Sequence, residues 1–248
     1  MRAGFSTLGC PGLPLDEVLA LAVKHGADLV ELRIADDEPV HIGLSGTERA
    51  AVKRRFAEAG VAFGALATYV KLSDPGLAGP LAAHVELAAD LGAPALRLFP
   101  GDVAPADGVR RLSDGLESAR GSGVALTVET HDEYIRADRL APILSELDGR
   151  VGAVWDVMHT WRGGEAVPES LAALRPYLAE LQIKDIPSAA DRRPIAPGTG
   201  VLPLREALDA AWAAGFDGPV VFEHEAKWRA DAQPFEECLV AALELSAR

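Results

Sequence analysis

Short apolar runs alternate with helical patterns along the whole chain, and this alternation restricts the fold more than any other feature of the sequence. Such alternation is typical of βα units, whose strands pair in parallel. Repetition of strand, loop and helix about every 30 residues gives eight units, which fill the chain. The sequence therefore predicts an α/β fold, a single-domain (β/α)8 TIM barrel over residues 1–248. We expect its strands at residues 3–7, 28–32, 62–67, 95–99, 125–129, 152–156, 180–184 and 220–223.

The first predicted helix shows how each unit is built. Apolar residues recur at helical spacing over residues 15–25, and Gly26 follows at the position of a helix C-cap. A glycine also precedes later predicted strands, at Gly60, Gly92, Gly123 and Gly215. A doubly wound open sheet is the alternative architecture, but no glycine-rich dinucleotide fingerprint follows the first strand.

Composition and charge restrict the compartment and the partners. No apolar stretch reaches the roughly 18 residues of a membrane span, and the N-terminus lacks the apolar core of a signal peptide. Cys10 and Cys238 lie at opposite ends of the chain, which favours a reducing cytoplasm. A formal net charge of -13 repels phosphate backbones. We therefore expect a cytoplasmic protein with neither nucleic acid nor membrane as a partner.

Four polar residues end four of the predicted strands. In a (β/α)8 barrel the carboxyl ends of the strands carry the chemistry, so these four side chains should converge on one point. Oxygen atoms that converge in this way are typical of a divalent metal site. The alternative for any one residue alone is an ordinary strand end that faces water. The four are Glu129, Asp156, Gln182 and Glu223.

Further polar residues follow these strand ends and are candidates for contact with a substrate. His131 and His159 come two and three residues after a predicted ligand, and either can instead be a structural histidine. Lys184 shares a strand face with Gln182, where a buried ammonium must form an ion pair or supply charge to the substrate.

Two more candidate groups lie in or near the last loops. Glu225 shares a face with Glu223, and so does Lys227 if that strand continues. A solvated loop is the alternative for Lys227. Arg192, which precedes Arg193 in the seventh βα-loop, is placed to hold a phosphate or carboxylate, although an exposed pair explains it equally well.

These motifs resemble the sugar phosphate isomerase/epimerase family, which has the xylose isomerase-like TIM barrel. The matching motifs are Val-Glu-Thr-His (128–131), Asp-x-x-His (156–159), Lys-Asp (184–185), Gly-Thr-Gly (198–200) and Glu-x-Glu-x-Lys-Trp (223–228). The resemblance implies that Glu129, Asp156, residue 182 and Glu223 bind one divalent metal. It also implies that His159 contacts the substrate and that Glu129 and Glu223 move the proton. Homologues often pair, so we expect a homodimer.

The chain departs from the family at Gln182, where histidine is usual. A glutamine oxygen can bind a hard cation, and an all-oxygen ligand set favours Mn2+ or Mg2+ over zinc. The resemblance therefore implies a metal-dependent isomerase or epimerase that acts on a sugar, a cyclitol or a related hydroxy-carbonyl compound through an enediolate. A dehydratase of an inosose- or dehydroshikimate-like compound is one alternative. A binding subunit without catalysis is the other, and Gln182 keeps it open.

Overall fold

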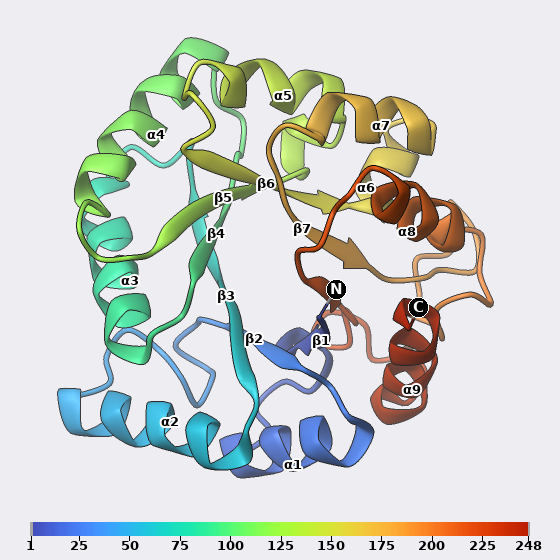
Figure 1. Cartoon of the computed structure of the whole chain (residues 1–248), viewed down its shortest axis with the longest axis horizontal. Coiled ribbons are helices and arrows are strands. Elements are labelled where there is room, and N and C mark those ends of the chain that lie inside the picture. The colour runs from blue at the N-terminus through green and yellow to red at the C-terminus, as the bar shows by residue number, and fades with distance from the viewer. Residues whose placement is uncertain (1, 248) are drawn as a thin grey trace.

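The computed structural model describes residues 2–247, which form a closed barrel of eight parallel strands (Figure 1). Each strand pairs with the next in the sequence, and β8 pairs with β1 to close the barrel. This confirms the predicted fold, and each predicted strand overlaps an observed one. The strands are β1 (Ala3–Ser6), β2 (Leu29–Arg33), β3 (Ala62–Lys71), β4 (Ala95–Phe99), β5 (Ala125–Glu129), β6 (Val151–Asp156), β7 (Leu178–Ile183) and β8 (Val220–Phe222).

The helices form a ring outside the strands (Figure 1). They are α1 (Leu15–His25), α2 (Gly46–Ala59), α3 (Ala78–Leu91), α4 (Pro105–Ser118), α5 (Ala137–Ser145), α6 (Val157–Arg162), α7 (Val167–Leu174), α8 (Leu204–Ala213) and α9 (Phe235–Ser246), with short 3-10 turns η1 (Thr7–Gly9) and η2 (Asp132–Tyr134). Among residues 2–247, no helix is long and apolar enough to cross a membrane.

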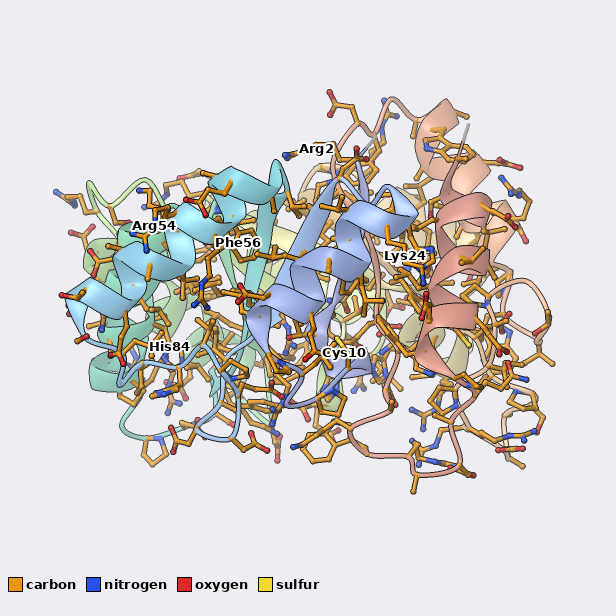
Figure 2. The ribbon with its side chains drawn as sticks, turned by 90° about the horizontal axis from the view of Figure 1, so that it is seen from below. Arg2, Cys10, Lys24, Arg54, Phe56 and His84 are labelled. Atoms are coloured by element: carbon orange, nitrogen blue, oxygen red, sulfur yellow. The ribbon has the colours of Figure 1, made fainter. Side chains whose placement is uncertain are left out.

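The local signals in the sequence determine the helix ends. α1 begins and ends at the predicted residues, and Gly26 caps it in the left-handed conformation with a φ of 72°. Gly60 and Gly92 cap α2 and α3 in the same way. Figure 2 shows α1 and α2 side by side outside the barrel, with Lys24 of α1 beside α9, where it forms an ion pair with Glu236.

The sixth unit differs from a single strand and helix. Its crossover holds two helices, because α6 ends at Gly163-Gly164 and α7 starts anew with a proline in its first turn. Gly164 has a φ of 79°, which a continuing helix does not allow. The short α6 therefore stays at the carboxyl end of β6, where its first turn lies beside the barrel mouth.

The strands carry apolar side chains on the face that packs against the helices and polar side chains on the face that lines the barrel interior. Buried aliphatic side chains of the strands pack with those of the helices in one core, which includes Val30, Leu96 and Leu126. Charged side chains instead meet across the barrel interior. The Arg97 guanidinium of β4 lies 3.9 Å from the carboxylate of Glu223, which follows β8, although β4 and β8 are not neighbours in the sheet. A contact between such distant strands is possible only through the interior.

The loop between β7 and α8 is held by one buried side chain. The Asp185 carboxylate accepts backbone N–H groups from Gly198 at 2.8 Å and Gly200 at 2.9 Å, and from Leu202 at 3.3 Å. A Cβ atom at Gly200 would lie 2.2 Å from the Asp185 carboxylate, so only glycine fits there. The Lys-Asp and Gly-Thr-Gly motifs thus include a structural contact, which fixes the loop that carries Arg192.

We expect Gly200→Ala to destabilise the protein, because the new methyl group would overlap the Asp185 carboxylate and the Ile186 carbonyl oxygen. The expected loss is about 1–3 kcal/mol in the free energy of unfolding, as for other overpacked sites. Gly46→Ala is the matched control, since nothing lies within 4 Å of a Cβ atom at that helix position. Chemical denaturation followed by circular dichroism measures both, and equal stabilities of the two variants would contradict the role given to Gly200.

Candidate functional site

A cavity of about 380 Å³ opens at the carboxyl ends of the strands. Its wall draws on residues at or after the ends of β1, β3, β4, β5, β6, β7 and β8. This is the face where (β/α)8 barrels carry their active sites. The polar and aromatic residues that line it are Tyr69, Arg97, Phe99, Glu129, His131, Asp132, His159, Arg162, Arg192, Glu223, Glu225 and Trp228.

Three of the four predicted ligands come together at this end of the barrel, and two of them, Glu129 and Glu223, line the cavity. Glu129, Asp156 and Glu223 each offer a carboxylate oxygen, and these oxygens lie within 4.8 Å of one another. All three residues are buried. Gln182 is also fully buried, and it pairs in register with Asp156 of the neighbouring strand. Glu129 and Asp156 thus end β5 and β6, Gln182 lies one residue before the end of β7, and Glu223 directly follows β8.

Two buried cations share the floor with the carboxylates. The Lys184 ammonium lies 2.8 Å from the Asp156 carboxylate and 2.8 Å from that of Glu225, and it also pairs with Glu223. The Arg97 Nε lies 3.1 Å from the Glu129 carboxylate. Arg97 is a residue that sequence reasoning missed. The signal was an arginine in the middle of a strand that is otherwise apolar.

Charge in the barrel interior is unbalanced. Five carboxyl groups, those of Glu31, Glu129, Asp156, Glu180 and Glu223, face the two cations of Lys184 and Arg97, and none of these seven residues is more than 4% exposed. A buried carboxylate without a counter-charge is costly, so further positive charge or bound protons must offset it. Protons supply part of this charge, because burial raises the pKa of Glu31 well above its usual value and that of Glu180 to about 7.

The ligand atoms themselves fit a divalent cation. Among residues 2–247, Gln182 Oε1 is buried without a hydrogen-bond partner, whereas Glu129 Oε2 lies 3.1 Å from Arg97 Nε and Asp156 Oδ2 lies 2.8 Å from the Lys184 ammonium. Buried acceptors normally have a partner. Hard cations such as Mn2+ and Mg2+ take oxygen ligands of these types. Glu129, Asp156, Gln182 and Glu223 therefore suit such an ion by their chemistry, and the Gln182 oxygen also lacks another partner.

The carboxyl groups of Glu129 and Glu223 differ in acidity. Burial raises the pKa of Glu129 well above its usual value, against the pull of the Arg97 guanidinium. Burial acts on Glu223 in the same sense, but the Lys184 ammonium and the Arg97 guanidinium hold the pKa of Glu223 below its usual value. Two carboxyl groups with pKa values moved apart are typical of an acid and base pair. Glu223 is thus an anion at neutral pH and is able to accept a proton.

Both predicted histidines line the cavity. Asp156 ends β6 and also caps α6, since its carboxylate accepts the backbone N–H of His159 at 3.1 Å. This cap explains the Asp-x-x-His spacing, because it turns the first residues of α6 over the floor. The His131 and His159 rings lie 4.6 Å apart between centroids. Burial lowers the pKa of each, so both imidazoles are neutral at pH 7.

The histidines also form a second possible ligand set. Glu129, His131 and His159 have ligand atoms within 4.8 Å of one another, as the three carboxylates do. Glu129 belongs to both sets. His131 is only half-buried, whereas every carboxylate of the first set is buried. The two sets differ in chemistry, because nitrogen ligands suit zinc better than magnesium or manganese.

The structure places the remaining predicted residues at the rim. Glu225 is half-buried and joins the floor through Lys184. Arg192 lines the cavity. Lys227 does not line it, because β8 ends at Phe222 and the chain turns, so that the Lys227 ammonium pairs with Asp37 instead. Its role in substrate binding stays a prediction.

Aromatic side chains that sequence reasoning did not select form one side of the mouth. Tyr69 and Trp228 contact edge to face with centroids 6.4 Å apart. The Arg33 guanidinium lies over both rings, at 5.1 Å and 5.6 Å from their centroids. Trp228 is 57% exposed, so its ring is free to contact a ligand that enters the cavity.

Comparison with known proteins identifies the family. The model of the xylose isomerase-like TIM barrel family matches residues 19–240, and the chain belongs to this family. A Streptomyces coelicolor protein named "Putative hydroxypyruvate isomerase" is 34% identical over 87 residues. That match covers 35% of this chain and only 29% of the relative.

Solved structures share the fold over nearly the whole chain. D-psicose 3-epimerase with D-tagatose from Clostridium cellulolyticum H10 aligns with a TM-score of 0.81 and 16% identity, over 99% of this chain and 98% of that one. The IOLI protein with a bound zinc atom aligns with a TM-score of 0.77 and 19% identity, over 99% and 96%. A probable 3-DHS dehydratase, AsbF from Bacillus anthracis, aligns with a TM-score of 0.79 and 17% identity, over 100% of both chains.

Two variants decide between the two ligand sets. We expect Asp156→Asn to weaken Mn2+ binding by more than about tenfold, because it removes a charged oxygen ligand, while asparagine still caps α6. His131→Ala should leave Mn2+ affinity within about threefold of the wild type if the all-oxygen set binds the ion. Isothermal titration calorimetry measures both affinities. Loss of binding in His131→Ala and not in Asp156→Asn would assign the ion to the histidine set.

Proposed function

We propose that this member of the xylose isomerase-like TIM barrel family is a divalent-metal-dependent isomerase or epimerase of a hydroxy-carbonyl compound. The observation that carries the proposal is the cluster of Glu129, Asp156 and Glu223, whose carboxylate oxygens lie within 4.8 Å of one another and of which Glu129 and Glu223 line the cavity. We assign one cation, Mn2+ or Mg2+, to these residues and Gln182. An ion bound there polarises a substrate carbonyl and stabilises negative charge on its oxygen.

The residues of the chain perform the proton transfer. The Glu223 carboxylate, which Lys184 and Arg97 keep ionised, takes a proton from the carbon next to the carbonyl, and the electron pair moves to the carbonyl oxygen to give an enediolate. Glu129, whose pKa is raised by burial, returns a proton. Its return to the neighbouring carbon isomerises the compound, and its return to the opposite face epimerises it. The neutral His159 imidazole has an N–H to donate to a substrate oxygen.

A dehydratase is the second candidate. The same first step removes a proton next to a carbonyl, and loss of a hydroxyl from the adjacent carbon then gives water and a double bond. The similarity to a probable 3-DHS dehydratase over the full chain supports this candidate for an inosose- or dehydroshikimate-like compound. A binding subunit without catalysis is the third reading. Turnover of any hydroxy-carbonyl compound would exclude it.

The mouth of the cavity favours an acid as substrate. Arg162 and Arg192 both line the cavity and are exposed, and among residues 2–247 neither has a hydrogen-bond or ion-pair partner. In a chain with a net charge of -13, two cations without a protein partner at one cavity suit an anionic group. A short hydroxy-keto acid, of the class that the Streptomyces coelicolor relative's name indicates, places a carboxylate at the mouth while its carbonyl meets the floor.

The compartment and the assembly stay predictions. Cys10 is half-buried and Cys238 is buried, and both are free thiols, which agrees with the proposed reducing cytoplasm. The homodimer expected from the family resemblance is measured directly by light scattering of the purified protein.

We expect Glu223→Gln to keep the fold and to lose more than about 1,000-fold in kcat. The amide has almost the same shape but cannot accept the proton, and general-base catalysis contributes about 100- to 10,000-fold. The assay uses the Mn2+-loaded enzyme with a panel of ketoses, aldoses, hydroxypyruvate and dehydroshikimate. Activity of the variant within tenfold of the wild type on the best substrate would show that Glu223 is not the base.

The anion site at the mouth is tested by arginine variants. Arg192→Ala and Arg162→Ala should each raise KM for an acid substrate by about 10- to 100-fold, the value of a charge-assisted hydrogen bond, with little change for a neutral ketose. Arg193→Ala is the matched control, because that guanidinium pairs with Asp191 and does not line the cavity. An equal rise in all three variants, or none in any, would contradict an acid-binding mouth.

A further inference from the structure

We propose that Glu180 is a positioning residue, which turns the side-chain oxygen of Gln182 toward the candidate metal centre. This inference rests on the proposed metal site. It concerns a residue that does not line the cavity and has no part in the proton transfer.

The contact between Glu180 and Gln182 determines which end of the Gln182 amide faces away from Glu180. Glu180 and Gln182 lie two residues apart on β7 and therefore on the same face of the strand. The Gln182 Nε2 donates a hydrogen bond to the Glu180 carboxylate at 3.2 Å. Because the amide nitrogen is the donor in this contact, it faces Glu180 and the amide oxygen faces the other way.

The free end of the amide is directed to the cavity floor. Lys184 continues the same face of β7 toward the mouth, and its ammonium lies 2.8 Å from the Asp156 carboxylate. Gln182, which pairs in register with Asp156, thus lies level with that carboxylate and between Glu180 and Lys184 along one strand face. Its Oε1 is buried and has no hydrogen-bond partner among residues 2–247. A buried acceptor without a partner is costly, and a cation on the floor would satisfy it.

The orientation matters because the two ends of an amide differ as ligands. The oxygen has lone pairs for a hard cation, whereas the amide nitrogen offers only hydrogens and would repel the ion. Without a fixed acceptor beneath it, the side chain is able to rotate and present either end. Glu180 is 3% exposed and forms no ion pair among residues 2–247, so the fold maintains a costly buried acid at this position. Holding the amide accounts for that acid.

A double-mutant cycle tests the proposal, with Mn2+ titrated calorimetrically. Glu180→Met should weaken Mn2+ binding by about 10- to 100-fold, which is typical when a residue that orients a ligand is lost. Gln182→Leu should weaken it as well. Because Glu180 acts through Gln182, the double variant should bind Mn2+ as Gln182→Leu does. Circular dichroism confirms that each variant is folded.

A third variant separates the hydrogen bond from the charge. Glu180→Gln keeps an acceptor oxygen for Gln182 but removes the negative charge, so it should retain Mn2+ affinity within about threefold of the wild type. A loss as large as in Glu180→Met would mean that Glu180 acts by its charge alone and would overturn the proposal. So would a further loss when Glu180→Met is added to Gln182→Leu. No Mn2+ binding by the wild type would instead contradict the metal site itself.

The same contact predicts the effect of a histidine at position 182. In Gln182→His, one ring N–H would donate to Glu180 and the other ring nitrogen would face the floor, which is the usual arrangement of a metal-binding histidine beside a carboxylate. Zinc and cobalt should then gain affinity relative to magnesium by about tenfold or more. Unchanged metal preference in Gln182→His would show that residue 182 does not face the ion and would overturn the proposal.

Discussion

The excess of carboxylates over cations inside the barrel is the constraint on which the rest of the site depends. Lys184 and Arg97 together contact Glu129, Asp156, Glu223 and Glu225, and Arg97 does so across the barrel, from β4 to the end of β8. These two cations keep Glu223 acidic, while burial makes Glu129 a weak acid. They do not balance all of the buried carboxyl groups, and the Gln182 oxygen is left without a hydrogen-bond partner, which suits a divalent ion. The proposed acid–base chemistry and the proposed cation binding both depend on this imbalance.

Several residues of the site also build the scaffold. Asp156 is both a candidate ligand and the cap that starts α6, so the position of His159 depends on the ligand itself. Asp185 follows Lys184 by one residue and anchors the loop that brings Arg192 to the mouth. The candidate ligands therefore lie at the ends of strands, whereas Arg192 lies in a loop that the Asp185 carboxylate holds.

The features that could be predicted from the sequence are those that depend on local periodicity. The eight strands, the bounds of α1 and its Gly26 cap follow from patterns within one unit, and strand-end position was enough to select Glu129, Asp156 and Glu223. Arg97 and Glu180 were not predicted as residues of the site. The periodicity of a strand shows that it is buried, but it does not show that polar side chains on its inner face contact other strands across a closed barrel. Lys227 was expected on the same face as Glu223 only if that strand continued, but the strand ends at Phe222. The separation of α6 from α7 depends on two glycines, whose effect is local to the turn.

The central claim is that Glu223 removes a proton from the carbon next to a substrate carbonyl. The most direct measurement is hydrogen exchange between that carbon and solvent, followed by proton NMR of hydroxypyruvate, ketoses and dehydroshikimate in D2O with the Mn2+-loaded enzyme. Isomerisation, epimerisation and dehydration all begin with this step, so the result does not depend on the final product. We expect at least one compound to lose its proton signal to deuterium with the wild-type enzyme and to keep it with Glu223→Gln. Exchange at the same rate in both proteins, or a wild type that exchanges none of these compounds, would contradict it.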